Sequence, residues 1–165
     1  LFFSFFIISF NLLSQTISSQ EIKNLAFEII KDSKNSVFIT IDSLGKPTSR
    51  IMDHHIINKN FDIYLVTNPF SRKVTHLRLN SSISINFQSP DGQNYVSING
   101  KGILIDDINL KIKYWKNDWT PFYNNIDADC ILIQIIPQSL ELVSLSNDII
   151  GDPKTWKPKT IIIDD

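Results

Sequence analysis

The apolar positions of residues 18–36 follow the spacing of one helical face. They recur at i, i+3, i+4, i+7 and i+8, as in a helix that packs one side against a core. Ser18 and Glu21 have the spacing of a capping box. The pattern predicts an amphipathic helix whose inner side consists of Ile22, Leu25, Ala26, Ile29 and Ile30.

β-Branched and aromatic residues dominate the stretches that follow, and turn-forming residues separate them. Gly100 and Gly102 indicate a bend or bulge inside one strand, and Pro137 indicates a break in the last. Because most of these strands follow one another through short turns, they are expected to pair as antiparallel hairpins. The pattern predicts a mainly β (α+β) domain of six or seven strands that close into a small antiparallel barrel. The predicted strands lie in residues 36–42, 47–57, 61–67, 82–89, 94–105 and 130–146.

Two more helical stretches interrupt the strands. Residues 71–80 form a short helix with Val74 and Leu77 facing inward. Residues 106–119 are predicted to form an amphipathic helix that Asp106 or Asp107 can cap. We therefore expect about three helices at the periphery of the barrel. The inner face of the third is predicted to carry Ile108, Ile112, Trp115 and Trp119.

The first residues differ from the rest of the chain in being almost entirely apolar. The run from Leu1 to Leu13 is shorter than the roughly 20 residues that span a bilayer, so no stable membrane span is expected. Residues 1–19 are predicted to be a signal peptide that starts before Leu1, with cleavage near Ser19 or Gln20, which implies a periplasmic or extracellular protein. The alternative is a buried N-terminal strand or helix in a cytoplasmic protein. Residues 20–146 would form the barrel, and residues 147–165 an irregular tail.

Composition and charge exclude several classes of function. A net charge of −1 gives no basic field for nucleic acid. The single cysteine, Cys130, excludes an internal disulfide and a zinc site built on several cysteines, and its apolar neighbours indicate a buried small hydrophobe. His54 and His55 would point to opposite faces of a strand, so no metal site is expected. Glycine-rich nucleotide loops and a nucleophile elbow are also missing from the sequence.

The strongest candidate for chemistry is the stretch VTNPFSRKVTHL, residues 66–77. Ser71, Arg72 and Lys73 stand where a helix is expected to begin, although the positive end of a helix disfavours cations. An anion would resolve this conflict, because free backbone N–H groups, an Arg fork and a Lys charge together can hold a phosphate. Arg50 shares a strand face with Met52, so it either points inward and meets an anion or simply points outward. The alternative is a solvated helix start with incidental cations.

Three sequence blocks in this order resemble the pyridoxamine 5′-phosphate oxidase-related family of FMN-binding split barrels. They are SRIM at residues 49–52, IYLVTNPFSRKVTHLRLNSSISINF at residues 63–87, and YVSINGKGIL at residues 95–104. The similarity covers roughly residues 21–145 and is closer to the shorter, general stress protein-like members. It implies a split β-barrel, a homodimer and an FMN at the subunit interface.

The resemblance also implies roles for particular residues. Its cofactor half is kept: Arg72 and Lys73, helped by Ser71, would hold the FMN phosphate. Its substrate half is lost: His55 and Tyr95 replace the Lys and Gln of the oxidases, and YWKNDW and the tail TWKPKTIIIDD replace their substrate motifs. Vitamin B6 oxidation is therefore not expected. The residues that would border the rest of the flavin are Arg50, Ile51, Met52, Val66 and Thr67.

These observations leave two classes of function open. The first is an FMN-dependent oxidoreductase acting on an undefined small molecule. The second is a non-catalytic flavin- or haem-binding module, in which His54, His55 or His76 could contact haem. Trp156 in the tail would cover the flavin or cross to the partner subunit, or else be buried on its own barrel.

Overall fold

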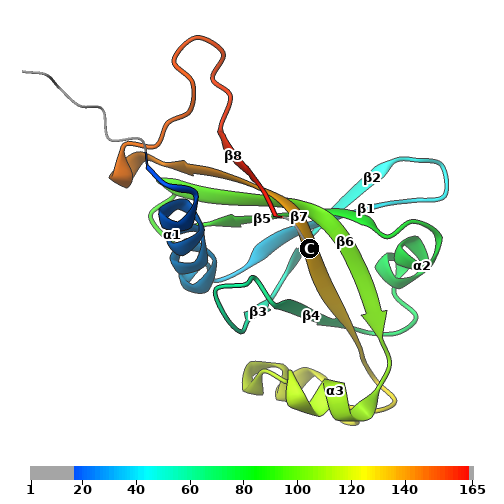
Figure 1. Cartoon of the computed structure of the whole chain (residues 1–165). Coiled ribbons are helices and arrows are strands. Elements are labelled where there is room, and N and C mark those ends of the chain that lie inside the picture. The colour runs from blue at the N-terminus through cyan, green and yellow to red at the C-terminus, as the bar shows by residue number, and fades with distance from the viewer. Residues whose placement is uncertain (1–16, 164–165) are drawn as a thin grey trace, which may run out of the picture.

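Figure 1 shows one strongly curved sheet with helices at its periphery, in a computed structural model that describes residues 17–163. The strands are β1 (Ser36–Ile41), β2 (Pro47–Met52), β3 (His55–Ile56), β4 (Ile63–Thr67), β5 (Ser82–Gln88), β6 (Asn94–Ile105), β7 (Ile131–Ser144) and β8 (Lys159–Ile162). The helices are α1 (Ser19–Asp32), α2 (Arg72–Leu79) and α3 (Ile108–Lys113), with the short 3-10 helices η1 (Asn117–Phe122) and η2 (Leu145–Asn147).

The strand order shows that the sheet curls until its two edges come close together. It runs β2-β1-β5-β6-β7-β4-β3, and all pairs are antiparallel. β2 and β3 stand at opposite ends of this order, yet only Asp53 and His54 separate them along the chain. The two edges therefore lie close in space, although no ladder joins them within residues 17–163. This arrangement is a mainly β, antiparallel split barrel, as predicted from the sequence.

Two short strands, β3 and β8, explain why the structure has more strands than the six or seven expected. The predicted strand 47–57 breaks at Asp53–His54, which leaves β3 with two residues. The tail, expected to be irregular, contains the four-residue β8, which pairs with β7. Between β7 and β8 the chain forms the long loop that projects from the sheet in Figure 1.

The bulge predicted in the Gly100 strand is present. The register between β6 and β7 shifts between Asn99 and Gly100, opposite Pro137. A Cβ atom at Gly100 would lie 2.1 Å from the carbonyl oxygen of Ile136, so no other residue fits this crossing without moving the backbone. The break predicted at Pro137 is wrong, because β7 continues through it to Ser144. Proline has no backbone N–H to donate, and the bulge accommodates this missing donor.

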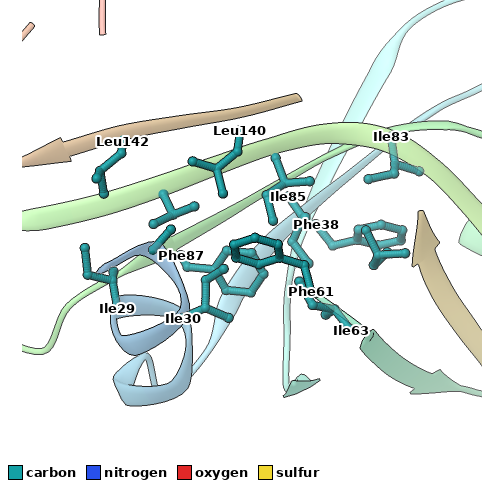
Figure 2. Close-up of a cluster of buried hydrophobic side chains, with 14 of the residues drawn as sticks. Ile29, Ile30, Phe38, Phe61, Ile63, Ile83, Ile85, Phe87, Leu140 and Leu142 are labelled. Carbon is teal, nitrogen blue, oxygen red and sulfur yellow. The ribbon is translucent and has the colours of Figure 1, made fainter. Parts of the chain in front are cut away.

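The core lies inside the curl of the sheet, and Figure 2 shows its aromatic centre. Phe38, Phe61 and Phe87 are almost completely buried there. α1 covers one end of the curl with Ile22, Ala26, Ile29 and Ile30, as predicted, while Leu25 is only partly buried. The predicted capping box is also formed, since Ser18 and Glu21 each accept a backbone hydrogen bond from the other.

Residues 106–130, between β6 and β7, differ most from the prediction. α3 ends at Lys113, and Ile112 on its predicted inner face is 59% exposed. Lys111 is buried instead, because its ammonium contacts Asp106 Oδ1 at 2.6 Å and donates to the carbonyl of Asp127 at 2.7 Å. We call residues 106–130 the excursion between β6 and β7. These polar contacts tie its two ends together and override the amphipathic pattern.

The predicted signal peptide lies largely outside the described residues. Of residues 1–19, only 17–19 are described, and they lead into α1. No described helix combines the length and apolar character that crossing a bilayer requires.

Candidate functional site

Three cations, Arg50, Arg72 and Lys73, gather where β2 meets the start of α2. Burial lowers the pKa of Lys73, and the nearby charges of Arg50 and Arg72 lower it further. The pKa of Arg50 is also lowered, first by burial and then by Arg72. None of the ion pairs within residues 17–163 includes any of these three cations. The fold therefore concentrates positive charge here without a carboxylate to balance it.

Neutral groups hold Lys73 and Arg50 in place. Lys73 Nζ donates to Thr67 Oγ1 at 2.8 Å, and Thr67 Oγ1 lies 3.2 Å from Ser71 Oγ. Arg50 Nη1 donates to Thr40 Oγ1 at 2.8 Å and to the carbonyl of Phe38 at 3.2 Å, so its side chain turns inward rather than outward. Hydroxyl and carbonyl oxygens fix the positions of Lys73 and Arg50 but leave their charge uncompensated.

The start of α2 adds to the positive potential. Asn68 forms the turn after β4 by accepting from the backbone N–H of Phe70 at 2.8 Å and of Ser71 at 3.1 Å. Ser71 occupies the N-cap position, as predicted, but its side chain makes no capping hydrogen bond. The first N–H groups of the helix are therefore not capped by this hydroxyl, and such groups are suited to bind an anion.

A pocket of about 320 Å³ is lined by residues of this cation cluster and by aromatic residues. Thr67 and Lys73 come from the cation cluster. Trp119, Phe122 and Tyr123 come from the excursion between β6 and β7 and are called the aromatic wall. A larger hollow of about 650 Å³ between Ile17 and the loop of residues 148–160 contains none of the predicted site residues. The remaining residues that line the smaller pocket are Ile51, Met52, Asp53 and Val66.

Asp53 holds the aromatic wall against the barrel. Its carboxylate accepts from Lys116 Nζ at 2.7 Å, from Trp119 Nε1 at 2.8 Å and from the backbone N–H of His54 at 2.9 Å. Trp119 is 2% exposed and packs edge-on to Trp115 with ring centroids 5.6 Å apart. Figure 1 shows α3, next to this wall, at the end of the sheet opposite the projecting loop. Asp53 therefore links the connection between β2 and β3 to the wall.

The structure thus brings together all eight residues of the predicted cofactor site. Five of them line the pocket itself: Ile51, Met52, Val66, Thr67 and Lys73. Ser71 contacts Thr67, and Arg50 and Arg72 contribute to the positive field around Lys73. Sequence reasoning missed the role of Asp53 and the pocket contribution of the aromatic wall. The only available signal was the density of aromatic residues from Tyr114 to Tyr123.

The three weaker candidates lie elsewhere. His55 sits behind the wall, with Nδ1 3.3 Å from the carbonyl of Tyr114. Tyr95 lines a separate hollow of about 440 Å³, which shares Ile51 with the pocket. Trp156 is 83% exposed on the projecting loop, so the alternative in which it is buried on its own barrel is wrong.

The other histidines and the cysteine have structural surroundings. His54 is buried, its Nε2 lies 2.9 Å from the carbonyl of Ile30, and burial lowers its pKa. His76 Nδ1 lies 2.9 Å from Thr40 Oγ1. Cys130 is fully buried, as predicted, and burial raises its pKa. Within residues 17–163, no three potential metal ligands cluster.

Taken together, the pocket suits a ligand that carries both an anionic group and a flat ring. Arg and Lys provide directional and point-charge contacts for a phosphate. Aromatic side chains offer faces and edges to a planar ring. The pocket thus pairs two different kinds of recognition within one small space.

Comparisons with known proteins agree with this fold. Residues 20–143 match the family model described as pyridoxamine 5′-phosphate oxidase like. No curated protein matches the sequence.

Solved structures show the same fold at low identity. General stress protein 26 from Bacillus anthracis is 23% identical, with 74% of this chain and 93% of that chain covered and a TM-score of 0.65. A related protein from Clostridium acetobutylicum is 18% identical over 88% of this chain and 97% of its own, with a TM-score of 0.73. A haem-binding protein from Mycobacterium smegmatis is 13% identical over 89% of this chain and 59% of its own, with a TM-score of 0.66.

Proposed function

The chain belongs to the pyridoxamine 5′-phosphate oxidase-like family, and we propose on this premise that it is an FMN-binding oxidoreductase acting on a small molecule. The observation that carries the proposal is the cluster of Arg50, Arg72 and Lys73, which has no carboxylate partner among the described residues. Mutual repulsion makes this cluster unfavourable by itself. A bound phosphate would relieve it.

The residues around the pocket fit the two parts of FMN. Arg72 and Lys73 would hold the phosphate, and the hydroxyls of Thr67 and Ser71 would donate to it. Ile51, Met52 and Val66 supply an apolar border. When bound, FMN would supply electron and hydride transfer, while the protein provides binding and orientation.

The lining of the pocket argues against a phosphorylated substrate. Lys73 is the only cation among the residues that line the described pocket, and the phosphate of FMN would occupy it. A second phosphate would then find aromatic residues and no further cation. This agrees with the loss of the oxidase substrate motifs from the sequence. We therefore propose a substrate other than a phosphorylated vitamin B6 compound.

Haem is the second candidate ligand, because a haem-binding protein shares the fold. The positions of the histidines favour FMN. None of the three histidines lines the pocket, and His54 is packed edge-on against Phe87 in the core. Haem uptake is therefore kept as an outcome of the binding test.

A second copy of the chain would complete the site if the family's dimer is present here. Ile51 is 66% exposed and lines both the pocket and the hollow that contains Val37 and Tyr95. The pocket thus borders an apolar surface on the outer face of β1 and β2. Burial of this surface in a homodimer would shield the cofactor from water.

The binding experiment uses the whole chain purified without added cofactor and then titrated with FMN. The protein is expected to be yellow as purified or to become yellow on titration. Light scattering of the FMN-bound protein should give twice the mass of one chain. Arg72→Ala with Lys73→Ala should weaken FMN binding at least about a hundredfold, because two charge-assisted contacts are lost. Arg78→Ala with Lys101→Ala removes the same charge from exposed positions away from the pocket and should leave binding unchanged.

Three outcomes distinguish the possibilities. A protein that ignores FMN contradicts the proposal, and uptake of haem in its place supports the second candidate. If the protein binds FMN, it is reduced with dithionite and then mixed with a panel of acceptors. Reoxidation that is no faster than that of free FMN, with every acceptor, identifies a binding module. Accelerated reoxidation by a particular acceptor supports the oxidoreductase.

A further inference from the structure

We propose that Phe122 sets the affinity of the pocket for the ring of its ligand by covering that ring from the rim. The proposal rests on the proposed function, since it concerns the same pocket. It adds a residue that the phosphate contacts and the sequence motifs do not identify. It also places recognition of the ring on the excursion between β6 and β7 rather than on the barrel strands.

The first observation is the combination of exposure and position. Phe122 is 79% exposed and yet lines the pocket beside Trp119 and Tyr123. An exposed aromatic residue alone carries no information, because single apolar residues are common on protein surfaces. At the edge of a pocket, however, its free ring surface is available to something that enters the pocket. Trp119, at 2% exposure, has almost no such surface left.

The second observation is the support of the turn that carries Phe122. η1 ends at Phe122 and contains Pro121, which restricts its backbone. Trp115 Nε1 donates to Thr120 Oγ1 at 3.1 Å, and Trp119, within the same 3-10 helix, is anchored to Asp53. The ring of Phe122 is therefore presented from a fixed turn, which reduces the entropy lost when a ligand binds.

The third observation is the presence of two kinds of chemistry in one pocket. Lys73 is the only cation among the residues that line the described pocket, and Trp119, Phe122 and Tyr123 are its aromatic residues. Contacts with the aromatic residues should respond to the ring and not to the phosphate. The two kinds of contact can thus be tested separately with FMN and with riboflavin, which has the same ring and no phosphate.

The test measures dissociation constants of FMN and riboflavin for the whole chain by fluorescence titration. Phe122→Ala should weaken the binding of both by about fivefold to tenfold, as expected for the loss of one aromatic contact. Arg72→Ala with Lys73→Ala should weaken FMN binding and leave riboflavin unchanged. Phe122→Tyr and Phe122→Trp should restore binding of both ligands. Because Phe122 is exposed, its replacement should not change the melting temperature.

Phe70→Ala is the matched control. Phe70 is 93% exposed in the turn before α2 and does not line the pocket. If Phe122→Ala binds both flavins as tightly as Phe70→Ala does, while the Arg72 and Lys73 replacement abolishes FMN binding, this inference is overturned and the proposed function stands. If the wild-type chain binds neither flavin, both are overturned.

Discussion

At the scale of single residues, His54 shows how burial decides the role of a side chain. The sequence DHH at residues 53–55 offers three groups that could act as ligands, acids or bases. In the structure, Asp53 anchors Lys116 and Trp119, and His54 enters the core against Phe87. Nε2 of His54 donates to the carbonyl of Ile30, whereas Nδ1 is buried without a partner. A buried imidazole of this kind is most stable in its neutral form.

This burial makes a prediction about pH. Because burial lowers the pKa of His54, the unfolded chain binds a proton near pH 6.5 that the folded chain does not bind until the pH is lower. The free energy of unfolding should therefore fall as pH drops below about 6.5, by up to about 1.4 kcal/mol per pH unit from this residue. His54→Gln, which can still donate to Ile30, should have a flatter profile.

Urea unfolding at several pH values between about 5 and 7.5 would measure the effect. His76→Gln is the control, because His76 is only half-buried. Equal pH slopes for wild type and His54→Gln would contradict the prediction.

At the scale of elements, local patterns predicted most helices and strands because their causes lie within the elements. The buried side of α1, its capping box and the inward Val74 and Leu77 of α2 follow directly from residue spacing. The excursion 106–130 could not be predicted in this way. Its course depends on Lys111 reaching Asp106 and Asp127, and on Asp53 reaching Trp119 from another part of the chain.

Two glycines in β6 allow a comparison within one element. At Gly100 a Cβ atom would meet backbone, the carbonyl oxygen of Ile136 at 2.1 Å. At Gly102 it would meet side chains, Leu77 Cδ2 at 2.9 Å and Ile83 Cγ2 at 3.3 Å. Side chains can rotate away, whereas the bulged ladder between β6 and β7 cannot. Gly100→Ala should therefore destabilise the protein by more than about 3 kcal/mol, and Gly102→Ala by about 1–2 kcal/mol.

Denaturant unfolding of both variants would check this order. If Gly102→Ala proved the more damaging, the packing of α2 onto the barrel would be more rigid than the bulge. If neither variant lost stability, the close approach at Gly100 would not exist in solution.

At the scale of the whole molecule, one edge of β7 is shared by two strands. β4 pairs with Ile131–Ile135, and β8 pairs with Ser139–Leu142, on either side of the bulge opposite Gly100. β8 thus extends the barrel at the end that β4 does not reach. It also places Ile161, opposite Leu140, in the main core.

The contribution of β8 can be tested with two adjacent residues of the same type. Ile161 is 8% exposed and Ile162 is 66% exposed. Ile161→Ala should lower the free energy of unfolding by about 2–4 kcal/mol, since it leaves a cavity in the core. Ile162→Ala should change it by no more than about 0.5 kcal/mol. Equal effects in thermal or urea unfolding would mean that β8 does not pack on the barrel as described.

The sequence by itself determined most of the strands and the cationic part of the pocket. Thr67, Ser71, Arg72 and Lys73 lie within one turn and the start of one helix, so their proximity is local. The tertiary structure alone decided the aromatic part. Asp53 and Trp119 are 66 residues apart, and they meet only because the curled sheet brings the connection between β2 and β3 beside the excursion that follows β6. Residue periodicity encodes contacts within an element, whereas contacts of this length depend on how the whole chain closes.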